Sequence, residues 1–122
     1  MTIDDTLTHS IIGCAMEVHN VLGNGFQEVI YQRALAIELD SVGVAYRREV
    51  EMPLFYKGHE IGSRRVDFLV ENKLLVEIKA VLVLEDVHLA QGLNYLTAYN
   101  LETGLLINFG GTRLAFKRLY RK

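Results

Sequence analysis

Two carboxylates and a lysine interrupt an otherwise apolar stretch of the chain, RRVDFLVENKLLVEIKA at residues 64–80. Asp67 lies among valine, phenylalanine and leucine residues, whereas Glu77 and Lys79 alternate with apolar residues further along. Charged side chains are costly to bury unless they are paired or bind a metal ion. These three groups are therefore candidates for a chemical role on two neighbouring β-strands.

The spacing of these charges determines whether they can meet. Side chains alternate between the two faces of a strand, so Glu77 and Lys79 share one face. A three-residue hairpin loop at residues 71–73 would place Asp67 directly opposite Glu77. In the same register Arg65 lies opposite Lys79, and all four charges converge on one face. A two-residue loop would scatter them, so the register decides between the two arrangements.

Directly opposed carboxylates at Asp67 and Glu77 would repel each other. A divalent cation between them would remove this repulsion. Carboxylate oxygens without a nearby histidine or second cysteine suit Mg²⁺ or Mn²⁺ better than Zn²⁺. Lys79 could hold an attacking water there or offset charge that develops on a phosphate. The competing interpretation is a ladder of Asp–Arg and Glu–Lys pairs on a solvated face of the sheet.

Composition and length indicate a folded globular protein. The chain has 122 residues, of which half are apolar and 23% are charged, so we expect one domain over residues 1–122. The single cysteine, Cys14, excludes an internal disulfide and fits a reducing compartment. No apolar run approaches the roughly 18 residues of a membrane span, and the polar start does not resemble a signal peptide. We therefore expect a cytoplasmic protein that does not enter a membrane.

The charge balance gives no overall attraction to nucleic acid, because the net charge is −2. Basic residues nevertheless occur in small groups, at residues 47–48, 64–65 and 117–122. These groups could form a basic patch after folding. Equally, they could be solvated strand edges whose charges prevent aggregation.

Apolar periodicity predicts three helices and five strands in the order ααβββαββ. The predicted helices cover residues 5–22, about 26–42 and about 86–99. The predicted strands are 48–56, a strand that ends at Val70, then 74–80, 105–109 and 113–120. Because strands 74–80 and 105–109 flank a helix, we expect a right-handed parallel crossover in a mixed sheet. Pro53 indicates that its strand lies at a sheet edge or bulge.

Three motifs in the chain resemble those of a known family. Asp67, nine intervening residues and Glu77-Ile78-Lys79 resemble the D-x(n)-E-x-K core of the PD-(D/E)XK nuclease superfamily, with Val66 in place of the proline. GFQEVIY at residues 25–31 matches the G-x-x-E-x-x-Y signature of the GxxExxY family within it. QGLNY at residues 91–95 resembles the Q-x-x-x-Y motif of the RecB-like exonuclease branch.

The resemblance implies an α/β fold with a restriction-endonuclease-like core and a role for each motif residue. The implied catalytic residues are Asp67, Glu77 and Lys79. The implied ligands of Mg²⁺ or Mn²⁺ are Asp67, Glu77, the Ile78 carbonyl and Glu28, the last directly or through water. The implied substrate contacts are Gln91, Tyr95 and Tyr31.

Two functions follow from these observations. The first is a metal-dependent nuclease that hydrolyses phosphodiester bonds in nucleic acid, DNA rather than RNA. No DNA-binding appendage is recognisable, so activity would need a dimer, a protein partner or a short flexible substrate. The alternative is a catalytically idle module of the nuclease fold that binds protein or nucleic acid. The acidic balance favours that alternative, and the intact Asp67, Glu77 and Lys79 argue against it.

A homodimer is the expected assembly, because a small domain with a proline-bearing edge strand and grouped arginines can pair with a copy of itself. Light scattering at micromolar concentration is the measurement. A solution that contains only a 13.8 kDa species would contradict this expectation.

Overall fold

The computed structural model describes residues 5–121 and has the predicted element order. Lys122, part of the basic group at residues 117–122, lies outside the described residues. The helices are α1 (Asp5–Leu22), α2 (Glu28–Ser41) and α3 (Asp86–Ala98). The strands are β1 (Tyr46–Tyr56), β2 (His59–Val70), β3 (Leu74–Lys79), β4 (Thr103–Asn108) and β5 (Ala115–Tyr120). The mixed α/β fold expected from the sequence is confirmed.

The five strands form one mixed sheet in the order β1-β2-β3-β4-β5. β3 and β4 are parallel and α3 connects them, which confirms the predicted parallel crossover, whereas its right-handed sense stays a prediction. Val70 pairs with Leu74, so the turn at residues 71–73 is the three-residue loop on which the predicted register depends. Pro53 lies on the edge strand β1, and a register shift follows between Leu54 and Phe55.

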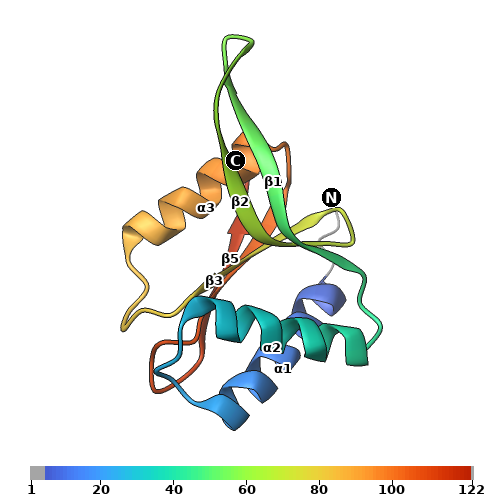
Figure 1. Cartoon of the computed structure of the whole chain (residues 1–122), viewed down its shortest axis with the longest axis vertical. Coiled ribbons are helices and arrows are strands. Elements are labelled where there is room, and N and C mark those ends of the chain that lie inside the picture. The colour runs from blue at the N-terminus through green and yellow to red at the C-terminus, as the bar shows by residue number, and fades with distance from the viewer. Residues whose placement is uncertain (1–4, 122) are drawn as a thin grey trace.

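Helices cover both faces of the sheet: α1 and α2 lie on one side and α3 on the other (Figure 1). β3 is buried on both faces because its apolar side chains alternate between two clusters. Leu74, Val76 and Ile78 pack in the α1–α2 cluster, whereas Leu75 packs beneath α3. Glu77 follows Leu75 by two residues and therefore faces the α3 side.

Gly92 explains how closely α3 approaches the sheet. A Cβ atom at this position would overlap the side chain of Leu119 on β5, so a glycine lets the helix pack directly on that strand. The cost is a glycine inside a helix, about 1 kcal/mol relative to alanine. This close packing fixes the distance between α3 and the charged residues of β3. Within residues 5–121, no helix is both long and apolar enough to cross a membrane.

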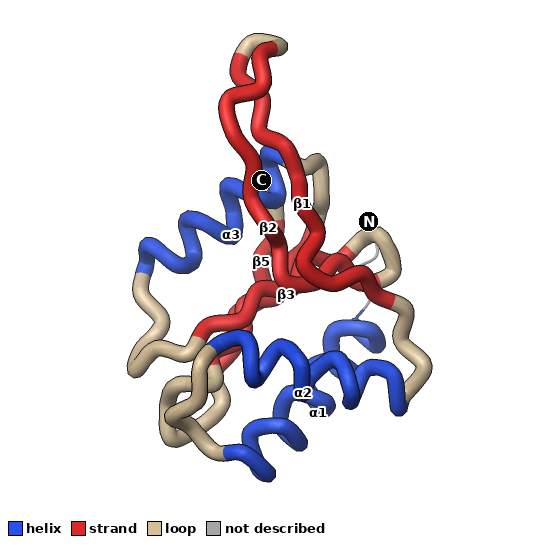
Figure 2. Tube along the Cα trace, in the orientation of Figure 1, coloured by secondary structure: helices blue, strands red, loops and turns tan. Residues whose placement is uncertain are grey.

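The β1–β2 hairpin extends well beyond the sheet. β1 pairs with β2 from Tyr46–Val70 to Tyr56–His59, but β2 pairs with β3 only over Phe68–Val70. The distal part of the hairpin, residues 53–65, projects from the body of the molecule as two strands (Figures 1 and 2). We call residues 53–65 the arm.

Candidate active site

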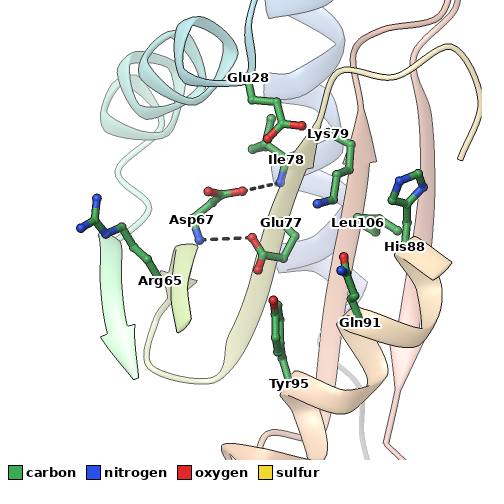
Figure 3. A pocket seen from close by; sticks show the side chains of 11 residues that line it. Glu28, Arg65, Asp67, Glu77, Ile78, Lys79, His88, Gln91, Tyr95 and Leu106 are labelled. Atoms are coloured by element: carbon green, nitrogen blue, oxygen red, sulfur yellow. Dashed lines mark hydrogen bonds between the residues drawn. The ribbon is translucent and has the colours of Figure 1, made fainter. Parts of the chain in front are cut away.

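The ladder between β2 and β3 ends where the carboxylates begin. Its last pair is Phe68–Val76, so Asp67 and Glu77 are next in the predicted register but are not paired through their backbones. Side chains replace the missing ladder bonds (Figure 3). The Ile78 N–H donates to Asp67 Oδ2 at 2.7 Å, and the Asp67 N–H donates to Glu77 Oε2 at 3.3 Å. Each carboxylate thereby accepts a backbone N–H group of the neighbouring strand.

Gln32 on α2 is a third component of this arrangement. Its Nε2 donates to Asp67 Oδ1 at 3.0 Å, and the residue is only 6% exposed. Its Oε1 is the one buried side-chain oxygen or nitrogen without a hydrogen-bond partner among the described residues. The orientation of the amide is therefore set by the hydrogen bond from Nε2 to Asp67. Both oxygens of Asp67 therefore accept a hydrogen bond from a fixed donor.

Sequence reasoning missed Gln32. One signal was present, because Gln32 lies four residues after Glu28 and hence on the same face of a helix. The motif directed attention to Glu28 and Tyr31 instead.

Glu77 is the most perturbed acid of the site. It is 9% exposed, and its burial, followed by the hydrogen bond and charge of Asp67, raises its pKa to about 9. The Asp67 N–H and the Lys79 charge lower the pKa but do not offset burial. Without a bound cation, Glu77 therefore retains its proton at neutral pH.

A pocket of about 180 Å³ opens beside the two carboxylates. The side chains of Asp67, Glu77 and Lys79 point toward it from the strands, and Gln91 and Tyr95 point toward it from α3 (Figure 3). The structure thus brings together five residues singled out in the sequence. An anion that entered the pocket would meet one ammonium group, one amide and one phenol.

Arg65 and His88 border the same pocket but are engaged elsewhere. Arg65 points away from the carboxylates in Figure 3, and its Nε lies 3.6 Å from Glu51 Oε2. The Nδ1 of His88 accepts the Glu85 N–H at 2.9 Å as part of a capping box at the start of α3. The four-charge cluster expected from the sequence is therefore incomplete, because Arg65 pairs with an acid of β1.

Glu28 lies at the edge of the pocket, on the first turn of α2. No group of three or more His, Cys, Asp or Glu side chains in residues 5–121 is arranged to hold a metal ion. Glu28 therefore does not join Asp67 and Glu77 as a direct third ligand in this structure. The contact through water remains a prediction.

Tyr31 does not reach the pocket, contrary to the expectation that it contacts substrate. It is fully buried and stacks on Phe109, with ring centroids 4.7 Å apart. Its hydroxyl donates to the Gly23 carbonyl at 2.6 Å and accepts the Phe26 N–H at 3.2 Å. The tyrosine of the G-x-x-E-x-x-Y motif therefore holds the turn that precedes α2, and so positions Glu28.

The donor set fits a hard divalent cation. Two carboxylates and the Ile78 carbonyl offer oxygen atoms, which Mg²⁺ and Mn²⁺ prefer. A carboxylate has about four lone-pair sites, so Asp67 retains acceptor capacity beyond its two hydrogen bonds. A cation would also favour the ionised form of Glu77, which burial opposes.

Fold and site together define a nuclease-fold protein with its acidic residues on adjacent central strands. The chain belongs to the PD-(D/E)XK nuclease superfamily, whose family model matches residues 5–119. Nucleases of this superfamily typically use divalent metal ions.

The fold is similar to a solved structure described as "Crystal structure of SSO0001", with a TM-score of 0.60 and 21% sequence identity. The similarity covers 75% of this chain and 48% of that one, so this chain spans about half the length of its structural relative. At this identity the likeness concerns the fold alone. No curated protein matches the chain significantly.

The raised pKa of Glu77 makes the stability of the metal-free protein depend on pH. Glu77 ionises near 4.5 in the unfolded chain but near 9 in the folded one, so unfolding releases a proton between these values. The free energy of unfolding should fall as pH rises through this range, by at most about 1.4 kcal/mol per unit. Glu77→Gln should lose most of this decline, because glutamine stays neutral. Urea denaturation in EDTA from about pH 5 to about pH 8.5 measures it, and equal declines in both proteins would contradict the assignment.

The Gln32 contact should tune metal binding at Asp67. Gln32→Leu keeps the approximate shape but removes the donor that orients Oδ1, and such losses typically weaken metal affinity about 10- to 100-fold. Titration of Mn²⁺ by calorimetry measures the affinity. Gln27→Leu is the matched control, because Gln27 is exposed and makes no side-chain cap hydrogen bond. Equal affinities of Gln32→Leu and wild type would remove Gln32 from the site.

Proposed function

We propose that the chain is a metal-dependent nuclease of the GxxExxY type that hydrolyses phosphodiester bonds of DNA. The reciprocal hold between Asp67 and Glu77, beside a pocket that Lys79 also borders, is the observation that carries this proposal. Two acids held close together in a site of low solvent access destabilise the metal-free protein. A protein under selection for stability alone would lose such an arrangement.

Asp67, Glu77 and the Ile78 carbonyl would hold Mg²⁺ or Mn²⁺. A divalent cation there supplies Lewis-acid stabilisation of the negative charge that develops on a phosphate. Glu77 must release its proton to act as a ligand, and the nearby charge of Lys79 favours that release. Glu28, at the edge of the pocket, would contact the cation through water.

Lys79 would orient the attacking water or neutralise charge on the phosphate. It is half-buried and two residues from Glu77 on the same strand, so it is held at a fixed distance from the acids. Gln91 is exposed at the pocket opening and can donate its amide to a phosphate oxygen. Tyr95, half-buried one helical turn further, can donate its hydroxyl or stack on a base. These two side chains would orient the backbone for in-line attack.

The second candidate function is a catalytically idle module of the same fold that binds nucleic acid or protein. One observation favours it: no three His, Cys, Asp or Glu side chains of residues 5–121 are grouped so that they could hold one metal ion. Intact Lys79 and the fixed orientation of Asp67 argue for the active form. The single domain, the homodimer and the cytoplasmic location stay predictions of the sequence.

Substitution of the two acids should abolish metal binding, whereas substitution of the lysine should abolish catalysis alone. Added Mg²⁺ or Mn²⁺ should raise the melting temperature of the wild type, because a ligand of the native state stabilises it. Asp67→Ala and Glu77→Ala should both lose this rise. Without metal, Glu77→Ala should be as stable as the wild type or more so, because it removes the buried acid. Asp67→Ala should be less stable, because it leaves the Ile78 N–H and the Gln32 amide without their acceptor. Lys79→Ala should keep most of the rise but lose hydrolysis by about 100-fold or more. The control is Lys117→Ala, an exposed lysine on β5 that should change neither property.

Single-stranded, duplex and branched DNA and RNA, each with both metals, form the substrate panel. If the wild type shows neither a melting shift nor cleavage of any of them, the idle module replaces the nuclease. Cleavage of RNA alone would keep the nuclease and correct its substrate.

A further inference from the structure

The arm leaves a large apolar and aromatic surface uncovered. None of residues 53–65 is buried, and at its end Phe55 is 62% exposed, Tyr56 59% and Ile61 66%. No helix of the described chain packs over this end (Figures 1 and 2). Two strands without a third strand or a covering helix gain little stability from burial. The arm is therefore maintained at a cost in stability, which suggests that it contacts a partner.

The charge of the arm differs in sign from that of the rest of the chain. Of the 13 Lys and Arg residues, three lie in residues 53–65, whereas only one of the 15 Asp and Glu residues does. The remainder of the protein is acidic. Lys57 also lies over the ring of Tyr56, with its ammonium 5.4 Å from the ring centroid. A basic surface interleaved with aromatic side chains is complementary to a nucleic-acid strand.

The strand edge of the arm is poorly suited to pairing with a second copy, so the proline that supported the expected homodimer counts against pairing at this edge. Pro53 has no N–H to donate, and the register shift between Leu54 and Phe55 interrupts the edge of β1. Prolines, bulges and exposed charges are the features that prevent edge-to-edge association. These features favour a nucleic-acid partner over a second protein chain.

The base of the arm is connected to the candidate active site. Arg65, its last residue, borders the pocket and lies two positions before Asp67. The hydroxyl of Tyr99 donates to the Met52 carbonyl at 3.0 Å, which ties β1 to α3 next to the arm. A ligand that lies in the pocket and extends over β2 would meet the arm.

We propose that the arm binds the backbone of the same nucleic acid whose reacting phosphate lies in the Asp67–Glu77 pocket. This inference rests on the proposed function. It adds a second contact with nucleic acid, outside the pocket, that was not recognised in the sequence. Lys57 and Arg64 contact phosphates, and the exposed aromatic side chains contact sugars or bases. Arg64 lies at the base of the arm, next to Arg65, which borders the pocket, and Lys57 lies at the end of the arm.

The length of β2 sets the reach of this contact. Eight residues separate His59 from Asp67, which is about 26 Å at about 3.3 Å per residue. A duplex rises about 3.4 Å per base pair, so Lys57 reaches a phosphate on the order of eight base pairs from the pocket. A shorter duplex cannot contact the pocket and Lys57 at the same time.

The experiment compares two double variants that each remove two positive charges. Lys57→Gln/Arg64→Gln changes the arm, and Lys117→Gln/Arg118→Gln changes β5 at the opposite edge of the sheet. Fluorescence anisotropy measures binding to a labelled duplex of about 30 base pairs, in EDTA to prevent cleavage, over a range of salt concentrations. The arm variant should bind several-fold more weakly, with a log–log salt slope reduced by about two. The β5 variant should match the wild type.

Length dependence provides the second readout. The difference between Lys57→Gln and wild type should vanish on duplexes shorter than about eight base pairs. A difference of the same size on such short duplexes would show that Lys57 binds them independently of the pocket, which would contradict one nucleic acid that spans both.

The remaining outcomes separate the arm from the nuclease. Equal losses in both double variants, or none, would overturn the arm contact, and cleavage by the wild type would still support the proposed function. If light scattering shows that only the arm variant dissociates a dimer, the arm is a protein interface and the inference is wrong. A wild type that neither binds nor cleaves nucleic acid would overturn both proposals.

Discussion

The site depends on one interaction: the carboxylate of Asp67 accepts the backbone N–H of Ile78 at the point where the β2–β3 ladder stops. An ionised acceptor makes a stronger hydrogen bond than a carbonyl, so this contact can hold two strands that no longer pair. It also fixes the distance between Asp67 and Glu77. The opening of the ladder gives the carboxylates room to face a common pocket rather than a continuous backbone. Gln32 extends the constraint to α2, so three elements meet at one side chain.

The same arrangement is unfavourable for stability without a cation. Burial and the neighbouring Asp67 keep Glu77 protonated, so Glu77 adds no negative charge to the site. A cation that displaces this proton would leave Glu77 ionised, and the charge of the cation would then offset the charge of the carboxylate. Binding and ionisation are therefore linked, and affinity for the cation should increase as pH rises toward the pKa of Glu77. If the site binds a cation as proposed, it exchanges stability of the metal-free fold for affinity.

Much of the fold could be predicted because its signals are local. The helix and strand boundaries follow apolar periodicity, and the three-residue turn determined the register through Phe68–Val76.

The contacts that complete the site are tertiary and gave weaker signals. Gln32 reaches Asp67 across 35 residues of sequence, and whether a buried glutamine faces a strand or a helix depends on packing. The role of Tyr31 was mistaken because a motif records which residues recur together, whereas only coordinates distinguish a substrate contact from a hydrogen bond to the Gly23 carbonyl. The projection of the arm could not be predicted either, because a hairpin pattern in the sequence does not show how much of β2 pairs with β3.

The positions of the pocket and the arm are set by the same helix. Gly92 brings α3 onto β5, and Tyr99 at its end binds the backbone of β1 at Met52. Between these two contacts lies Tyr95, whose side chain borders the pocket. A displacement of α3 would therefore move a side chain of the pocket and the base of the arm together. Under the proposed function, one helix would therefore position both the reacting phosphate and the strand beyond it. The proposed arm contact needs a positive field only around the arm, so the net charge of −2 does not oppose binding of a polyanion there.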